Sequence, residues 1–229
     1  MTQLSIILPV LDEAVSIGTR LADLQTLRKQ GVELVVVDGG SGDGTVALCA
    51  GLADQVLVAA RGRARQMNAG AAASHGEILL FLHVDTALPA QAIAAVTDAI
   101  EGGKQWGRFD VRIDGRHPML RIVERMMNWR SRLTGIATGD QAIFLRRDLF
   151  ERIGGYEDIP LMEDIRLCTR LKCLTAPACL AVPVTTSARR WEKHGVWRTV
   201  LLMWRLRAAH FFGADPKALA RHYGYRTEP

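Results

Sequence analysis

Short, continuous apolar runs recur through the first hundred residues, separated by glycine-rich turns and by segments with helical spacing. Runs of this kind are typical of strands buried on both faces of a sheet. Their alternation with helices predicts an α/β fold with a mostly parallel sheet flanked by helices. We expect strands at 4–10, 32–38, 55–60 and 77–84, and helices up to residue 29, over 45–52, over 61–74 and from Pro89 onward.

The second half of the chain has a less regular pattern. Residues 106–114 alternate like a strand with one solvated face, and no repeat or linker interrupts the sequence. We predict a catalytic domain over residues 1–188 and a basic, helical C-terminal extension over residues 189–229 packed on it. Further strands are expected at 142–147 and 180–184, and helices at 119–133, 162–174, 196–212 and after Pro216.

Composition narrows the class of protein. Apolar residues make up 48% and charged residues 23% of the chain, which argues against disorder. No apolar run reaches the length of about 20 residues that a membrane span needs, and no signal peptide is recognisable. The four cysteines form no CxxC pair, which favours reduced thiols and a cytoplasmic protein over disulfides or a zinc site.

The net charge of +5 is unevenly distributed. Residues 189–226 hold nine Lys or Arg and two acidic residues, which suggests phosphate, a membrane surface or nucleic acid as a partner. Of these three kinds of partner, we do not expect nucleic acid. Within this segment, the helix over Val196–Phe212 mixes arginine with tryptophan and phenylalanine. It predicts either peripheral membrane contact, at the inner membrane face, or packing on the domain or in a homodimer.

Polar residues directly after the predicted strands are the first candidates for function. Parallel sheets bind ligands at the carboxyl ends of their strands. Asp38 ends a buried strand and opens the turn GGSGDGT, where a base or ribose could approach the backbone. Asp43 in that turn suits an N-cap equally well. Arg61, Arg65 and Asn68 share one helical face, either as phosphate ligands or as a solvated surface.

Two carboxylate motifs carry the chemistry. Asp85, in His83-Val84-Asp85, could hold a divalent cation on a diphosphate, or cap the helix near Pro89. His83 could be a metal ligand, a phosphate donor or a buried histidine. Glu163 and Asp164 begin a predicted helix, where they could stabilise its dipole or supply a general base for an acceptor hydroxyl.

Four segments in order resemble the family 2 glycosyltransferases: SIILPVLDE, VVVDGGSGDGT, LLFLHVDT and PLMEDIRLCTRL. The resemblance runs from Ser5 to about Leu174 and implies a Rossmann-like, glycosyltransferase A fold. It implies transfer of a sugar from a nucleotide-diphosphate sugar, such as a UDP- or GDP-sugar, to an unknown acceptor, with inversion. It also implies a Mg²⁺ or Mn²⁺ ion held by Asp85 and a catalytic base, Asp164.

The same resemblance implies roles for further residues. On the donor side these are Pro9, Glu13, Asp38, Arg61, Arg65, Gln66, His83 and Asp85, and on the acceptor side Asp140, Gln141 and Glu163. Within the family, GRARQMNAGA, GDQAIFLRR and PLMEDI are similar to a bacterial subgroup linked to radical-SAM, selenodomain or arsenosugar genes.

Three residues depart from the family pattern. Asp12 stands where Asn is usual, His83 replaces the first Asp of the metal motif, and Met67 stands where many relatives have Arg. Arg189-Arg190-Trp191 is only faintly similar to the Arg-Trp motif of processive relatives, since the preceding Gln is missing.

Two other classes of function remain open. A nucleotidyltransferase would carry a glycine-rich, arginine-containing loop after its first strand, and PVLDEAVSIG has neither feature. A degenerate nucleotide-sugar-binding protein would fit the loss of one metal-motif Asp. The presence of Asp38, Asp85 and Asp164 together favours the enzyme.

Overall fold

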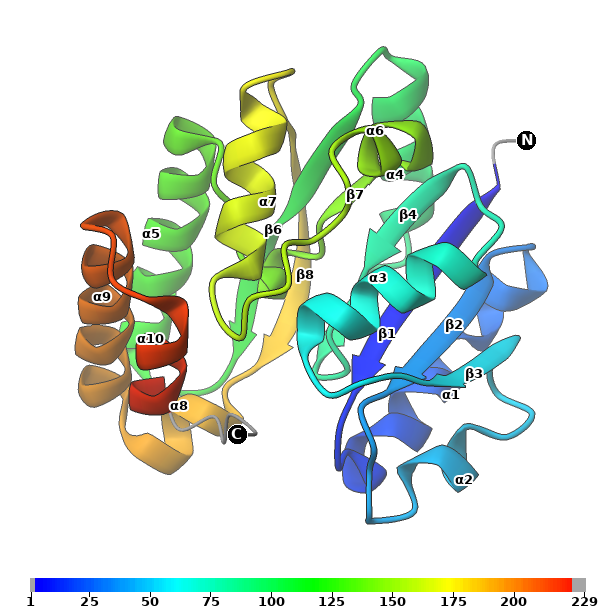
Figure 1. The fold of residues 1–229 in the computed structure, drawn as a ribbon, viewed down its shortest axis with the longest axis horizontal. Helices are drawn as coiled ribbons and strands as arrows, with labels where there is room; N and C mark the ends of the chain where they lie inside the picture. The colour runs from blue at the N-terminus through cyan, green and yellow to red at the C-terminus, as the bar shows by residue number, and fades with distance from the viewer. Residues whose placement is uncertain (1–2, 224–229) are drawn as a thin grey trace.

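The computed structural model describes residues 3–223 and has helices on both faces of a central sheet (Figure 1). Within this range the sheet has eight strands in the order β3-β2-β1-β4-β7-β6-β8-β5. The strands are β1 (Leu4–Val10), β2 (Glu33–Asp38), β3 (Gln55–Val58), β4 (Ile78–Phe81), β5 (Thr86–Ala87), β6 (Trp106–Asp114), β7 (Phe144–Arg146) and β8 (Ala178–Ser187).

Each of the two faces of the sheet carries one hydrophobic layer. On β1, Ile6 and Leu8 face one layer and Ile7 faces the other, as the period of two requires. Helices α1 and α4 cover the first side, and α3, α6 and α7 the second. The helices are α1 (Ala14–Lys29), α2 (Thr45–Cys49), α3 (Arg63–Ala73), α4 (Ala92–Glu101), α5 (Pro118–Thr134), α6 (Arg147–Arg152), α7 (Glu163–Lys172), α8 (Arg189–His194), α9 (Val196–Phe211) and α10 (Pro216–Tyr223).

The predicted α/β fold is confirmed, with parallel pairing of β1 to β2 and β4, of β2 to β3, and of β6 to β8. Strand β7 lies antiparallel to β4 and β6, and β5 antiparallel to β8. Strand β8 is twice as long as the predicted 180–184. A bulge shifts the partner of β6 from Leu180 to Pro183, at the residue that cannot donate a ladder hydrogen bond.

Several predicted boundaries were wrong. The fourth strand ends at Phe81 rather than at residue 84, and α2 ends at Cys49 rather than at residue 52. Helix α4 begins at Ala92 rather than near Pro89, because the Pro89 carbonyl accepts the Ala92 N–H in a turn before the helix. The predicted strand 142–147 pairs over only three residues, and Arg147 starts α6. Because α4 begins at Ala92 and has Gln91 as its N-cap, Asp85 does not cap this helix.

Helices α8 to α10 pack on the rest of the molecule. Val196 of α9 lies in one cluster with Leu120 of α5, and α9 runs beside α5 in Figure 1. Leu206 and Leu219 meet Leu161 in the segment before α7. In the part of the chain described, no helix combines the length and apolarity that crossing a membrane requires. Residues 224–229 of the predicted C-terminal extension lie outside the described residues, as do the side chains of Arg190 and His194.

Candidate active site

The loops after β1 and β4 open into a cavity of about 1750 Å³. Its other walls come from the starts of α3 and α7 and from α5, α9 and α10. The volume exceeds the roughly 300–1,000 Å³ of a typical small-molecule site. The cavity therefore has room for two substrates side by side.

His83, Asp85 and Asp140 form a group that could hold a metal ion. The loop after β4 carries the first two, and the 3-10 helix η1 (Gly139–Gln141) carries Asp140. One ligand atom of each lies within 4.8 Å of the others, and His83 Nδ1 is 3.4 Å from Asp140 Oδ1. Two carboxylates with one imidazole suit Mn²⁺ or Mg²⁺, and the imidazole favours the softer Mn²⁺.

Gly139 keeps this group in place because only a residue without a Cβ fits beside the His83 ring. A Cβ built on Gly139 would collide with the imidazole. We expect Gly139→Ala to displace His83 and to weaken Mn²⁺ binding by about tenfold or more, the scale for disturbed metal sites. Mn²⁺ titration by calorimetry measures this. Gly42→Ala is the control, because a Cβ there meets open space; equal Mn²⁺ affinity of Gly139→Ala and wild type would contradict the role.

Glu163 and Asp164 form the first turn of α7 and line the same cavity. Asp164 Oδ2 accepts the Gly139 N–H at 2.9 Å, which joins α7 to η1. Met162, the residue before the helix, has a left-handed φ of 69°. Asp12, with a φ of 52°, shares this conformation and also lines the cavity, whereas Ala142, the third such residue of the described chain, is buried outside the lining. Such strain is concentrated at functional sites.

Burial raises the pKa of both carboxyl groups in this turn. For Glu163, burial and the neighbouring Asp164 raise the pKa to about 7, against the opposing charges of Arg63 and His83. For Asp164, burial raises the pKa, while the Gly139 N–H opposes it. Carboxyl groups that titrate closer to neutral pH are suited to proton transfer.

The turn after β2 binds the turn after β1. Asp38 is buried outside the cavity lining, and its Oδ2 accepts the N–H groups of Gly40 and Ser41 at 2.8 Å each. The carboxylates of Asp12 and Asp43 accept N–H groups of the opposite turn. Asp43 therefore links two loops, and Gly44 is the N-cap of α2.

On the predicted donor side, Pro9, Glu13, Arg61, Arg65, Gln66, His83 and Asp85 line the cavity. Glu13 pairs with Arg189 of α8 at 3.3 Å, and Arg65 with Asp158 at 2.8 Å. Gln66 is buried and donates from Nε2 to the carbonyls of Val10 and Val37, which fixes the ends of β1 and β2.

The predicted face of Arg61, Arg65 and Asn68 does not form as such. Arg61 precedes α3, which begins at Arg63. The Asn68 side chain makes two hydrogen bonds to the backbone of Tyr156, at 2.8 and 2.9 Å, and so positions the loop before α7.

The predicted acceptor-side residues separate. Asp140 and Glu163 line the cavity, whereas Gln141 is buried beneath it. Gln141 Nε2 donates to Ser131 Oγ at 3.1 Å and to the Phe109 carbonyl at 3.3 Å. Sequence reasoning gave no role to a further part of the wall, because regular helices carry no local signal for such residues: Met126, Trp129, Arg130, Met203, Lys217 and Arg221. Trp204 and Arg207 also line the cavity, although the sequence pattern of Val196–Phe212 predicted membrane contact or packing for that helix.

Comparison with known proteins decides the family. Residues 5–154 match the family model described as Glycosyl transferase family 2. The chain belongs to glycosyltransferase family 2. Two thirds of the sequence carries this match, including β4 and the loop after it that holds His83 and Asp85. A search of curated protein sequences gave no significant match.

Solved structures of similar fold include two sugar-phosphoglycerate synthases and a mannosyltransferase. Mannosyl-3-phosphoglycerate synthase from Rubrobacter xylanophilus is 19% identical with a TM-score of 0.61, over 90% of this chain and 75% of that one. A mannosyltransferase from Pyrobaculum calidifontis, solved with GDP-Man and Mn²⁺, is 21% identical with a TM-score of 0.65, over 99% and 66%. Glucosyl-3-phosphoglycerate synthase from Mycobacterium tuberculosis, solved with Mn²⁺ and UDP, is 20% identical with a TM-score of 0.62, over 80% and 70%. These similarities support the glycosyltransferase A fold of the family 2 chain.

Proposed function

We propose that this family 2 glycosyltransferase moves a sugar from a nucleotide-diphosphate sugar to an acceptor hydroxyl with inversion, using Asp164 as the base. One observation carries the proposal. Asp164 and the group of His83, Asp85 and Asp140 lie in one cavity, tied together by the hydrogen bond from Gly139 to Asp164. A base and a leaving-group site held at fixed separation are what a direct displacement needs.

The residues divide into two roles. His83, Asp85 and Asp140 would hold Mn²⁺ or Mg²⁺, which supplies positive charge for the departing diphosphate. Arg61 and Arg65, at the start of α3, would contact the phosphates, and Glu13 the nucleoside. Asp38 would hold the backbone of its turn in position through the N–H groups of Gly40 and Ser41, without contacting the donor itself.

In the proposed reaction, each bond that forms is matched by one that breaks, and Asp164 receives the proton. The acceptor hydroxyl forms the new bond to the anomeric carbon as the bond to the diphosphate breaks. Asp164 takes the hydroxyl proton, and the diphosphate leaves with the bonding electron pair. Attack opposite the leaving group inverts the anomeric carbon.

The experiment is a thermal-stability screen with UDP-, GDP-, TDP- and CMP-sugars, each with Mn²⁺, Mg²⁺ or EDTA. Binding to the native state raises the melting temperature by mass action. We expect one nucleotide to give a metal-dependent rise that Asp85→Ala removes. The same rise in Asp85→Ala, or in EDTA, would contradict the metal role. Nucleotide-sugar binding without donor hydrolysis or transfer would indicate a degenerate binding protein. Release of diphosphate from a nucleoside triphosphate would instead indicate a nucleotidyltransferase.

The closer placement in the bacterial subgroup linked to radical-SAM, selenodomain or arsenosugar genes stays a prediction from GRARQMNAGA, GDQAIFLRR and PLMEDI. A cytoplasmic location, and the division into residues 1–188 and 189–229, are likewise proposals.

We also propose peripheral contact of α9 with an anionic membrane surface. Exposed apolar side chains recur on α9 at helical spacing, and α5 beside it has a similar stripe. Neighbouring positions on both helices are cationic: α9 has three Arg and no acid, and α5 four Arg and one Glu. In a homodimer through this face the like charges would meet, whereas anionic lipid neutralises them. The exposed apolar residues of this surface that lie outside the cavity lining are Ile122, Leu133, Trp197, Leu201, Phe211 and Phe212.

Co-sedimentation with phosphatidylglycerol and phosphatidylcholine vesicles tests this contact. We expect binding to the anionic vesicles alone, lowered several-fold in Trp197→Ser/Phe211→Ser because interfacial aromatic area is lost. Val15→Ser is the control, since Val15 is exposed on α1, away from the face. Absence of binding to anionic vesicles, or a change from dimer to monomer in the double variant, would refute membrane contact.

A further inference from the structure

We infer that the wall formed by α5, α9 and α10 is a binding site for an anionic acceptor, and that Arg130 is its main ligand for a phosphate or carboxylate group. The inference rests on the proposed function, because this wall and the proposed base line the same cavity. It adds the chemical class of the acceptor.

The charges that line the cavity are segregated. The loops around the metal-binding group contribute acidic and basic residues together. Among the described residues, the lining contributed by α5, α9 and α10 contains cations and no carboxylate. These cations are Arg130, Arg207, Lys217 and Arg221. A cavity wall of one sign of charge attracts ligands of the opposite sign.

Arg130 has hydrogen-bond donors that the protein does not use. Its Nε and Nη2 atoms are shielded from solvent and have no hydrogen-bond partner within residues 3–223. Burial of this guanidinium lowers its pKa, and the charge of Asp164 acts in the opposite direction. Leaving buried donors without acceptors is unfavourable. Because Arg130 lines the cavity, a rotation of its side chain that brings these donors to an anion in the cavity would recover that cost.

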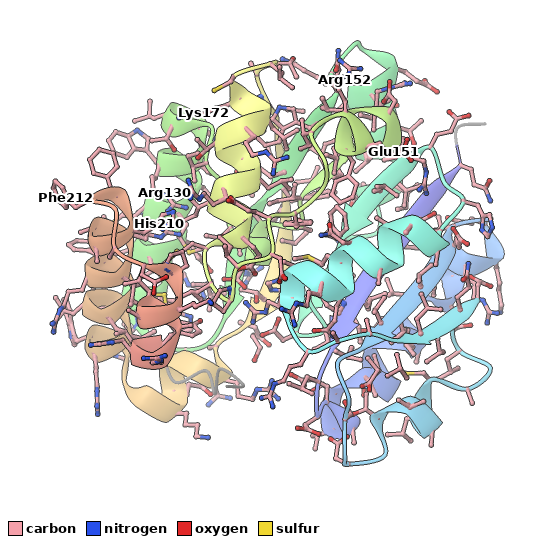
Figure 2. All side chains as sticks on the ribbon, viewed as in Figure 1. Arg130, Glu151, Arg152, Lys172, His210 and Phe212 are labelled. Carbon is pink, nitrogen blue, oxygen red and sulfur yellow. The ribbon has the colours of Figure 1, made fainter. Side chains whose placement is uncertain are left out.

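The geometry of a guanidinium specifies the ligand. Its adjacent N–H groups form a planar fork that matches two oxygens of a carboxylate or phosphate. In Figure 2 the Arg130 label lies on α5, beside α7 and α9. Arg130 and Asp164 line the same cavity, so an anion on Arg130 would share that cavity with the proposed base. The acceptor hydroxyl would then be close to its anionic group, with Trp129 and Trp204 available for an apolar portion.

The test compares Arg130→Met, Arg130→Lys and Arg125→Met by calorimetric titration with inorganic phosphate in EDTA. Arg125 is exposed on the same helix and lies outside the lining, so it is the matched control. We expect Arg130→Met to weaken phosphate binding about tenfold or more, Arg130→Lys to weaken it less, and Arg125→Met to leave it unchanged. Nucleotide affinity should stay at the wild-type value in all three.

A second measurement separates ligand binding from a structural role. Removal of an unpartnered buried charge should leave the melting temperature of ligand-free Arg130→Met equal to or above wild type. A lower melting temperature would mean that Arg130 stabilises the fold, and phosphate affinity equal to wild type would overturn the site. Failure of nucleotide binding in the wild type would instead refute the proposed function.

Glycerol phosphate in solution and vesicles containing phosphatidic acid distinguish the two sources of the anion. Weaker binding of Arg130→Met to glycerol phosphate alone assigns the site to a soluble acceptor. Weaker binding to the vesicles as well assigns it to a lipid headgroup. Unchanged binding to both would count against the inference.

Discussion

Asp164→Asn is expected to lower the rate of sugar transfer by about 100-fold or more, the usual scale for loss of acid–base help. Asparagine has nearly the same shape and can still accept the Gly139 N–H, but it cannot take a proton from the acceptor. Nucleotide affinity should therefore be unchanged. Until the acceptor is identified, water can serve in its place. The rate of donor hydrolysis is then measured from the release of the nucleoside diphosphate.

Asp98→Asn is the control for this substitution, because Asp98 is an exposed aspartate on α4 that does not line the cavity. It should turn over at the wild-type rate. If Asp164→Asn also does so, Asp164 is not the base, and the inverting mechanism loses its main support.

Glu163→Gln is expected to stabilise the protein above neutral pH and to have little effect near pH 4. The folded-state pKa of Glu163 is about 7, above the ordinary value of 4.5, because of burial and Asp164. Between these values the folded state holds a proton that the unfolded state releases, so the free energy of unfolding falls as the pH rises from about 4.5 to about 7. The loss is on the order of 3 kcal/mol.

Urea unfolding at pH 4, 5, 6, 7 and 8 in EDTA checks this dependence. The difference between Glu163→Gln and wild type should grow with pH and level off above pH 7. Glu101→Gln, at an exposed position on α4, should follow the wild type throughout. A constant difference at every pH would show that Glu163 has an ordinary pKa.

The pattern of apolar residues was sufficient for the parallel half of the fold. Strands β1 and β2 are continuous apolar runs, and their pairing follows from the right-handed crossover through α1. The antiparallel strand β7 was not predictable in the same way. It is three residues long, and it pairs with β4, which lies more than sixty residues earlier in the chain.

The candidate site shows the same division. Asp85 follows a buried strand, so topology alone places it at the carboxyl edge of the sheet. Its neighbour Asp140 comes from a short 3-10 helix whose position depends on β7, and the sequence could not pair it with His83.

Gln66 and Gln141 show a further limit of sequence reasoning. Both stand in segments that resemble the family's substrate-contacting regions, and both use their amide groups to bind backbone or neighbouring side chains. The type of residue is the same for a ligand contact and for an internal brace. Only the burial and the hydrogen-bond partners distinguish them.

All eight described strands end by Ser187, and the helices that complete the cavity follow β8. Insertions or exchanges after β8 would therefore leave the sheet register and the group of His83, Asp85 and Asp140 unchanged. Related enzymes could vary the part of the acceptor that lies against α9 and α10 by replacing this terminal segment, while Arg130 of α5 continues to bind the anionic group. A chimera that exchanges only the segment from α8 onward would then keep the anion preference of the parent that supplies α5 and change its preference for the remainder of the acceptor.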